Sequence, residues 1–218
     1  MKLAIVVLSF LFAQVVMAQP VSPQRLHEAA TRGDTKAIAA ALESGTPVDA
    51  VDRSGQTALL LAVTAGQTEA ARLLLQRGAS VNAQAVNHDT PWLLAGTLGR
   101  TAILELMLSH KPDLSLRNRF GGSALIPACE RGHVETIRLL TARSGIDVNL
   151  VNNLGWTCLL EIVILGDGGP RHVEATRLVL AAGANVNLAD RDGVTPLAHA
   201  RRRGQSAVAQ LLVAAGGK

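Results

Sequence analysis

Apolar residues along this chain recur at helical spacing in short blocks, and polar segments that contain glycine separate the blocks. In one block Ala70, Leu73 and Leu74 share a helix face, and Val173 and Leu178 do so farther along. No segment alternates apolar and polar residues with a period of two, which is the pattern of a half-buried strand. The pattern therefore predicts an all-α chain with almost no β-strand beyond short turns.

These blocks belong to a phrase that returns at a near-constant interval. A threonine or serine is followed by a glycine nine residues later in five copies: Thr57 with Gly66, Thr90 with Gly99, Ser123 with Gly132, Thr157 with Gly166, and Thr195 with Gly204. The steps between copies are 33, 33, 34 and 38 residues. A period near 33 is typical of stacked helical units, because each unit is too small to bury its own apolar face. We therefore expect an elongated solenoid of helix–turn–helix units.

Local chemistry supports the same elements. Thr57 precedes its helix as an N-cap, and Pro91 and Pro196 take the first helical position, where a missing N–H costs nothing. Glycines end the inner helices, where a left-handed residue is favoured: Gly66, Gly99, Gly132 and Gly204. Each copy thus carries its own signals for where a helix begins and ends.

The full motif resembles the ankyrin repeat family, and within it the short, single-domain, exported proteins of bacteria. Gly193-Val194-Thr195-Pro196-Leu197 matches the start of the family's unit, and residues 74–82 (Leu-Leu-Gln-Arg-Gly-Ala-Ser-Val-Asn) match its end. The resemblance covers about residues 22–216 and implies one ankyrin repeat domain, residues 19–218. Its expected units are a degenerate N-terminal unit (22–50), repeats one to four (about 51–83, 84–116, 117–150 and 151–188) and a C-terminal capping unit (189–218).

The first 18 residues have the layout of a secretory signal peptide. Lys2 supplies one positive charge, residues 3–16 are nearly all apolar, and Val16-Met17-Ala18 places small residues before a cut at Gln19. The alternative is an uncleaved anchor, but the apolar run of about 14 residues is shorter than the ~20 that a spanning helix needs. We expect cleavage after Ala18, a periplasmic or secreted mature chain, and no membrane attachment afterwards.

Charge and aromatic content argue against nucleic acid as a partner. The net charge of +4 becomes +3 once Lys2 is removed, and the only basic run is Arg201-Arg202-Arg203. A nucleic-acid surface needs basic stripes and stacking rings, whereas aromatic residues make up 2% of this chain. The basic run closes the last inner helix, where a terminal unit must present a polar surface.

Cys129 and Cys158 are the two cysteines of the chain. An oxidising compartment favours a disulfide, but repeat phase places Cys129 near the far end of one inner helix and Cys158 at the near end of the next. That offset is roughly 7 Å along the helix axis, added to the distance between helices. Because disulfides need Cα atoms within about 7 Å, we expect two buried, unpaired cysteines.

The predicted binding surface is the concave side, which the resemblance assigns to turn tips and inner helices. Phe120, Leu154 and Trp156 are apolar at tips, where polar residues would favour solubility. The predicted partner-binding residues are Arg119, Phe120, Arg131, Asn153, Leu154, Trp156 and Arg191. Such a mixture of aromatic, apolar and arginine side chains is typical of an interface hot spot. The alternative for Trp156 is packing over the neighbouring turn, whereas Trp92 occupies a core position.

Repeat four departs from the period. Five extra residues, Asp167, Gly168, Gly169, Pro170 and Arg171, enlarge the turn between its inner and outer helices, either as a partner-contacting loop or as a tolerated insertion. Glu161 stands where other units place leucine, so it needs a hydrogen-bond partner such as the loop backbone or an arginine. A metal site made of Glu161, Asp167 and His172 is an alternative.

The resulting expectation is a monomeric, non-catalytic module that binds an unidentified protein partner. No nucleophile and base pair, metal-ligand spacing or phosphate loop is present, so we predict no catalytic residue, no metal and no cofactor. The resemblance implies a link to oxidative-stress defence for some exported members. Two alternatives remain open: an immunity protein that occludes a secreted toxin, and an enzymatic or metal site at the repeat-four loop.

Overall fold

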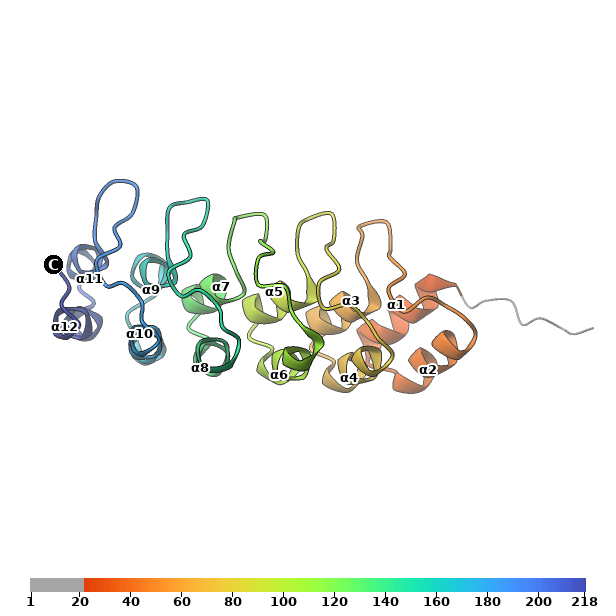
Figure 1. The fold of residues 1–218 in the computed structure, drawn as a ribbon. Helices are drawn as coiled ribbons and strands as arrows, with labels where there is room; N and C mark the ends of the chain where they lie inside the picture. Colours follow the sequence, from red (N-terminus) through yellow and green to blue (C-terminus); the bar gives the residue numbers. More distant parts are fainter. Residues whose placement is uncertain (1–21) are drawn as a thin grey trace, which may run out of the picture.

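The computed structural model describes residues 22–218, in which six helix–turn–helix pairs stack in chain order to form an elongated rod (Figure 1). The inner helices are α1 (Pro23–Arg32), α3 (Ala58–Ala65), α5 (Pro91–Thr97), α7 (Leu125–Glu130), α9 (Cys158–Leu165) and α11 (Pro196–Arg202). The outer helices are α2 (Thr35–Glu43), α4 (Thr68–Gln76), α6 (Thr101–Met107), α8 (Val134–Arg143), α10 (Pro170–Ala181) and α12 (Ser206–Ala214). A short 3₁₀ turn, Leu108–His110, follows α6.

The predicted all-α solenoid is confirmed over the described residues. A hairpin-like loop projects from each junction between successive pairs, above the row of inner helices in Figure 1. These loops form no strand in residues 22–218 beyond an isolated bridge between Val51 and Thr57. The predicted signal peptide, residues 1–18, lies outside the described residues.

The inner helices begin where their caps predict. The hydroxyls of four threonines accept the N–H three residues later, at 3.1–3.3 Å: Thr57, Thr90, Thr157 and Thr195. Pro91 and Pro196 occupy the first helical position, as expected. Repeat three differs, because Ser123 bonds to the N–H of Leu125 instead, and its inner helix α7 is correspondingly short.

The inner helices end at glycines in a left-handed conformation. Gly66, Gly99, Gly132 and Gly204 have φ between 62° and 72°, which confirms the prediction. Gly166 of repeat four is the exception, since its φ is −70° and its backbone is extended. The extra residues that follow Gly166 therefore change the local backbone and do not only lengthen the turn.

Inner helices carry most of the core. Leu59, Leu125 and Leu159 are at most 1% exposed, because each inner helix is covered by its outer helix and by the inner helices of both neighbours. Trp92 is 1% exposed, which confirms its predicted core position. Within the described part of the chain, no helix is both long and apolar enough to cross a membrane.

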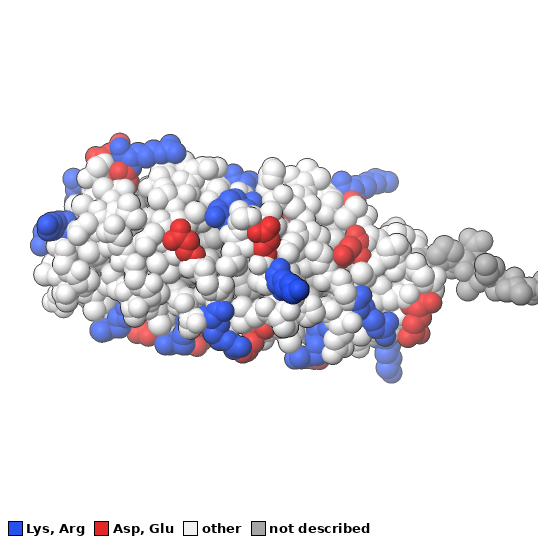
Figure 2. Space-filling model, in the orientation of Figure 1, with Lys and Arg blue, Asp and Glu red and all other residues white. Residues whose placement is uncertain are grey.

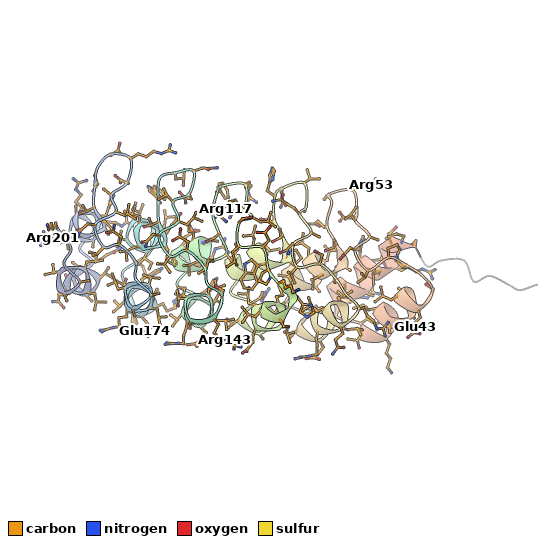
Figure 3. The ribbon with its side chains drawn as sticks, viewed as in Figure 1. Glu43, Arg53, Arg117, Arg143, Glu174 and Arg201 are labelled. Atoms are coloured by element: carbon orange, nitrogen blue, oxygen red, sulfur yellow. A yellow bond between two sulfur atoms is a disulfide. The ribbon has the colours of Figure 1, made fainter. Side chains whose placement is uncertain are left out.

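The outer helices present a mixed-charge edge. In Figure 2 blue and red side chains line the lower edge, over the outer helices, while the charged side chains across the middle of this face are separated by uncharged surface. Arg143 and Glu174, labelled on this edge in Figure 3, take part in bridges between units: Arg143 with Glu105 at 2.7 Å, and Glu174 with Arg138 at 3.1 Å. Exposed pairs of this kind each contribute about 0–1 kcal/mol, so they favour solubility more than stability.

Our prediction for the cysteines is wrong: Cys129 and Cys158 form a disulfide that joins α7 to α9, with Cα atoms 5.5 Å apart. The prediction assumed that successive inner helices lie level with one another. The helices are staggered along their axes. Cys129, six residues after the capping residue Ser123, therefore lies beside Cys158, which directly follows the capping residue Thr157 of the next unit. Gly96 and Ala124 occupy these two positions one unit earlier, and a Cβ added to Gly96 would lie 2.7 Å from the Ala124 Cβ.

Candidate functional site

The tips of the hairpins are held by a repeated side-chain hydrogen bond. In four tips, one side-chain oxygen accepts hydrogen bonds at 2.8–3.0 Å from the backbone N–H groups of the residues two and four positions later. The side chains that provide this oxygen are Asp52, Asn118, Asn152 and Asp190. Ala85 stands at this position in repeat two, where Asn87 and Asp89 bond to each other instead. Because each tip is ordered by its own side chain, the residues it displays have defined positions.

Neighbouring tips are also bonded to one another. The N–H of Val86 donates to the Ser54 carbonyl at 3.0 Å, and that of Asn153 donates to the Phe120 carbonyl at 2.9 Å. The Arg191 guanidinium continues the series by donating to the Asn153 carbonyl at 2.6 Å. Between repeats two and three, Gln84 Nε2 donates to the Arg117 carbonyl at 3.3 Å. The tips thus form a connected ridge along the rod, and Arg53 marks its first tip in Figure 3.

Five of the seven predicted partner-binding residues lie together on this ridge. We call Arg119, Phe120, Asn153, Leu154 and Arg191 the tip cluster. Phe120 is 52% exposed and Leu154 is 50% exposed, on the tips of repeats three and four. The Arg119 guanidinium lies 4.6 Å from the centre of the Phe120 ring and 3.7 Å from the Asp89 carboxylate, which limits its motion.

The other two predicted residues are placed differently. Trp156 is partly buried and packs against the hydrophobic core at the base of the repeat-four tip, so much of its ring serves packing. Arg131 caps the C-terminal end of α7, at the opposite end of that helix from the tip of its own unit. Arg131 therefore does not join the tip cluster.

Some other exposed apolar residues were not among the predicted partner-binding residues. Val86 is 76% exposed on the tip of repeat two. Val151 is 47% exposed at the base of the repeat-four tip. Leu165 is 49% exposed at the end of α9. The phase of Val86 in the repeat already places it on a tip, since it occupies the same position as Arg53 and Arg119.

Glu161 finds its partner in the tip of its own repeat. Its Oε1 accepts from Asn152 Nδ2 at 2.8 Å, and the side chains of Glu161 and Asn152 are nearly buried, at 4% and 6% residue exposure. The C-terminal unit has a counterpart with the same nine-residue separation, where His199 Nε2 and Asp190 Oδ2 lie 2.7 Å apart. A helix side chain supports the tip in both units, and neither the loop backbone nor an arginine is the partner of Glu161.

The second oxygen of Glu161, Oε2, is buried and has no hydrogen-bond partner. Burial and the nearby negative charge of Glu130 raise the pKa of Glu161 to about 7, and the bond from Asn152 offsets this only in part. Repeat four therefore holds a carboxyl group that changes charge close to neutral pH.

The five extra residues of repeat four form a bonded turn and the start of α10. Pro170 and Arg171 are helical, so the insertion lengthens the outer helix as well as the turn. Asp167 Oδ1 accepts from the Gly169 N–H at 2.8 Å and lies 2.7 Å from His172 Nδ1, and both contacts lower the pKa of Asp167. Gly168 lies against Gln205 of the next unit.

His172 keeps the insertion in phase with the other units. Its Nε2 lies 2.9 Å from the Glu130 carbonyl, at the end of the preceding inner helix. Gln67 and Gln205 make the equivalent contacts with the carbonyls of Thr31 and Val163, at 3.2 Å. Each of these three side chains thus joins its unit to the one before it.

The candidate metal ligands of repeat four are not brought together. Asp167 and His172 bond to each other, whereas Glu161 is bonded to Asn152. Across residues 22–218, no group of three or more histidine, cysteine, aspartate or glutamate side chains has an arrangement that could hold a metal ion.

Comparison with known proteins identifies the repeated unit. Residues 92–168 and 125–218 match the family model for ankyrin repeats in three copies, and residues 26–75 match that for ankyrin repeats in many copies. The ankyrin repeat protein YahD of Escherichia coli K12 is 40% identical over 188 residues, which are 86% of this chain and 94% of YahD.

Solved structures give the same result. An ankyrin repeat domain from Acinetobacter baumannii AYE is 51% identical with a TM-score of 0.85, over 88% of this chain and 98% of that domain. The ankyrin repeat protein EF0377 is 37% identical with a TM-score of 0.85, over 88% of this chain and 98% of its own.

Proposed function

Because the chain belongs to the ankyrin repeat family, whose repeats generally mediate protein–protein interaction, we propose that it captures a partner protein with its tip cluster. The ankyrin fold is generally a scaffold without catalytic activity, and we propose the same for this chain. Binding on such a scaffold depends on the residues displayed at its surface, so the partner is recognised by the tips and not by the shared frame.

One observation carries the proposal: Phe120 and Leu154 stand half exposed on two tips that are bonded to each other. Two large apolar side chains on one ordered ridge lose little conformational entropy when a partner covers them. Arginines flank them on both sides, Arg119 beside Phe120 and Arg191 beside Asn153. Aromatic residues and arginines are enriched at protein interfaces, so Phe120 with its neighbouring arginines has the composition of a binding surface.

We further propose that the chain acts in the periplasm or outside the cell. The N-terminal pattern of residues 1–18 supports export, and the disulfide between Cys129 and Cys158 supports an oxidising compartment. Fractionation of expressing cells with N-terminal sequencing tests this: we expect a mature chain that begins at Gln19 in the periplasmic fraction. Full-length chain retained in the cytoplasm would reject export.

Capture from a periplasmic extract of the native host tests the binding surface. Three immobilised chains are compared: wild type, the double variant Phe120→Ser with Leu154→Ser, and the control Val213→Ser, which alters a 51% exposed valine on α12. We expect the same protein to be retained by wild type and control, and at least roughly tenfold weaker retention by the double variant, because hot-spot residues each contribute about 1–2 kcal/mol or more. Equal retention by all three chains would remove the tip cluster from the interface.

A further inference from the structure

We propose that Glu161 is a positioning residue for the binding surface: through Asn152 it holds the repeat-four tip, and it holds that tip better when protonated than when ionised. The inference rests on the proposed function, since it concerns how the tip cluster is kept in its binding arrangement. Partner capture should accordingly be tighter in mildly acidic than in neutral or alkaline solution.

The first step is the chain of contacts from Glu161 to the surface. Asn152 donates to Glu161 Oε1 through Nδ2, and its Oδ1 accepts the backbone N–H groups of Leu154 at 2.9 Å and Trp156 at 3.0 Å. The Asn153 N–H, inside the same turn, bonds to Phe120 of the neighbouring tip. A single amide side chain thus connects the buried carboxyl group to the backbone that displays Leu154.

The second step is a comparison of tips within the chain. In repeats one and three, Asp52 and Asn118 hold the tip in the way that Asn152 does. The residues nine positions later are Leu61 and Pro127, so these tips lack a polar support from the inner helix. In the C-terminal unit the acid belongs to the tip, as Asp190, and the helix supplies His199. Repeat four is thus the unit in which the ionisable acid lies on the helix, under the tip.

The third step is the cost of ionising Glu161 in place. Its Oε2 is buried without a hydrogen-bond partner, so a negative charge there would lack compensation. Helices α7, α10 and α11 pack against α9. The charged or titratable side chains on these helices are Glu130 on α7, Arg171, His172, Glu174 and Arg177 on α10, and His199, Arg201 and Arg202 on α11. Of these, Glu130 is the one whose charge acts on Glu161, and it opposes ionisation.

Local opening of the tip relieves this cost, because water can then solvate the carboxylate. A solvated glutamate titrates near 4.5, whereas Glu161 in the closed arrangement has a pKa of about 7. Between these values the closed state binds more protons than the open one. The population of the open tip therefore rises roughly tenfold per pH unit from about pH 4.5 to 7 and then levels off.

Hydrogen exchange at single amides tests the coupling directly. Protection factors of the Leu154 and Trp156 amides are measured by NMR between pH 5 and 8, in wild type and in Glu161→Gln. The glutamine keeps an acceptor for Asn152 but cannot ionise. The amides of Phe120 and Gly122, which bond to Asn118 in the same way, are the internal control.

In wild type we expect the protection factors of the Leu154 and Trp156 amides to fall between ten- and a hundredfold from pH 5 to 7. Those of the control amides, Phe120 and Gly122, should not fall in this way. In Glu161→Gln the protection should stay high over the whole range. Protection at Leu154 and Trp156 that is independent of pH in wild type, or that falls equally in Glu161→Gln, would overturn the proposal.

Capture of the partner at pH 5 and pH 7.5 tests the consequence for binding. We expect wild type to retain the partner several-fold better at pH 5, and Glu161→Gln to retain it equally at both values. Equal retention by wild type at the two pH values would reject the effect on binding. If wild type retains no partner at either pH, the proposed function fails, and the exchange measurement alone decides whether Glu161 positions the tip.

Discussion

Two polar side chains of repeat four, His172 and Glu161, show how single residues adapt an irregular unit to a regular stack. His172 is 5% exposed, and both its ring nitrogens lie within hydrogen-bond distance of an oxygen, from Asp167 and from Glu130. Glu161 is equally buried but leaves one oxygen without a partner. We therefore expect substitutions at these two positions to have opposite effects on stability.

Replacement of His172 should destabilise the chain. His172→Ala removes two hydrogen bonds and leaves a cavity, so we expect a loss of about 2–4 kcal/mol in the free energy of unfolding. His172→Gln restores the contact that Gln67 and Gln205 make in their units and should recover at least half of the loss. Urea unfolding followed by circular dichroism measures both. Similar stabilities for the two variants would contradict the role of His172 as a junction between units.

Replacement of Glu161 should stabilise the chain, and only above mildly acidic pH. The pKa of Glu161 is about 7 in the folded state and 4.5 in the unfolded state. The contribution of Glu161 to the free energy of unfolding is therefore fully present below pH 4.5 and is lost as pH rises through 7. The difference in unfolding free energy between Glu161→Gln and wild type should grow from pH 4.5 to 7 by roughly 3 kcal/mol and then stay constant. Urea unfolding at a series of pH values measures this difference. A difference that is flat with pH would show that Glu161 titrates normally.

At the scale of elements, the stagger of the inner helices decides which residues can meet between units. The contact of Gly96 with Ala124 and the disulfide of Cys129 with Cys158 use the same two positions in successive units. Between α5, α7 and α9 these positions hold a glycine with an alanine and then two bonded cysteines, so the backbones approach closely there. The spacing of α5, α7 and α9 depends on these small side chains.

A methyl group at position 96 tests this spacing. Helix propensity alone would make Gly96→Ala more stable by about 1 kcal/mol, because Gly96 lies within α5. The new Cβ would, however, collide with Ala124, so we expect a net destabilisation of about 1–3 kcal/mol. Gly122→Ala, where the nearest atom is 3.4 Å from the added Cβ, is the matched control and should change stability little. Thermal unfolding of both variants decides the sign, and a more stable Gly96→Ala would refute the close approach.

The disulfide between α7 and α9 should contribute substantially to stability. It closes a segment with a sequence separation of 29, for which the loss of chain entropy in the unfolded state corresponds to about 3–4 kcal/mol. We expect Cys129→Ala with Cys158→Ala to unfold at lower urea concentration by that amount. Reducing agent should lower the wild-type midpoint and leave that of the double variant unchanged, whereas equal responses of the two chains would argue against the bond.

The elements themselves could be predicted from sequence, whereas the contacts between them could not. Thr57, Pro91 and Gly66 act within a few residues of their own position, so the caps, the helices and the period follow from local chemistry. The stagger that joins Cys129 to Cys158 depends on how whole units settle against each other. The partner of Glu161 was equally hidden, because it lies nine residues upstream in a tip and not in the enlarged turn beside it.

At the scale of the whole molecule, stability should be distributed along the rod. Successive helix pairs contact each other, and within residues 22–218 the first pair, α1 and α2, and the last, α11 and α12, lie at opposite ends of the rod (Figure 1). Such an array is described by the stability of each unit and of each interface between neighbours. Removing a terminal unit should therefore weaken the remainder without unfolding it, unlike the same deletion in a globular domain.

Deletion of residues 189–218 puts this distribution to the test. The truncated chain loses α11 and α12, and with them the bonds from Gln205 to the carbonyls of Val163 and Gly166. Only on the order of a sixth of the helical signal should disappear, and the remaining units should unfold at a lower urea concentration. The disulfide and the tips of repeats three and four stay within the retained part, so Phe120 and Leu154 should keep their relative positions. Loss of the entire helical signal would instead mean that the six pairs fold as one indivisible core, and local surfaces such as the tip cluster could then not be altered independently of the rest.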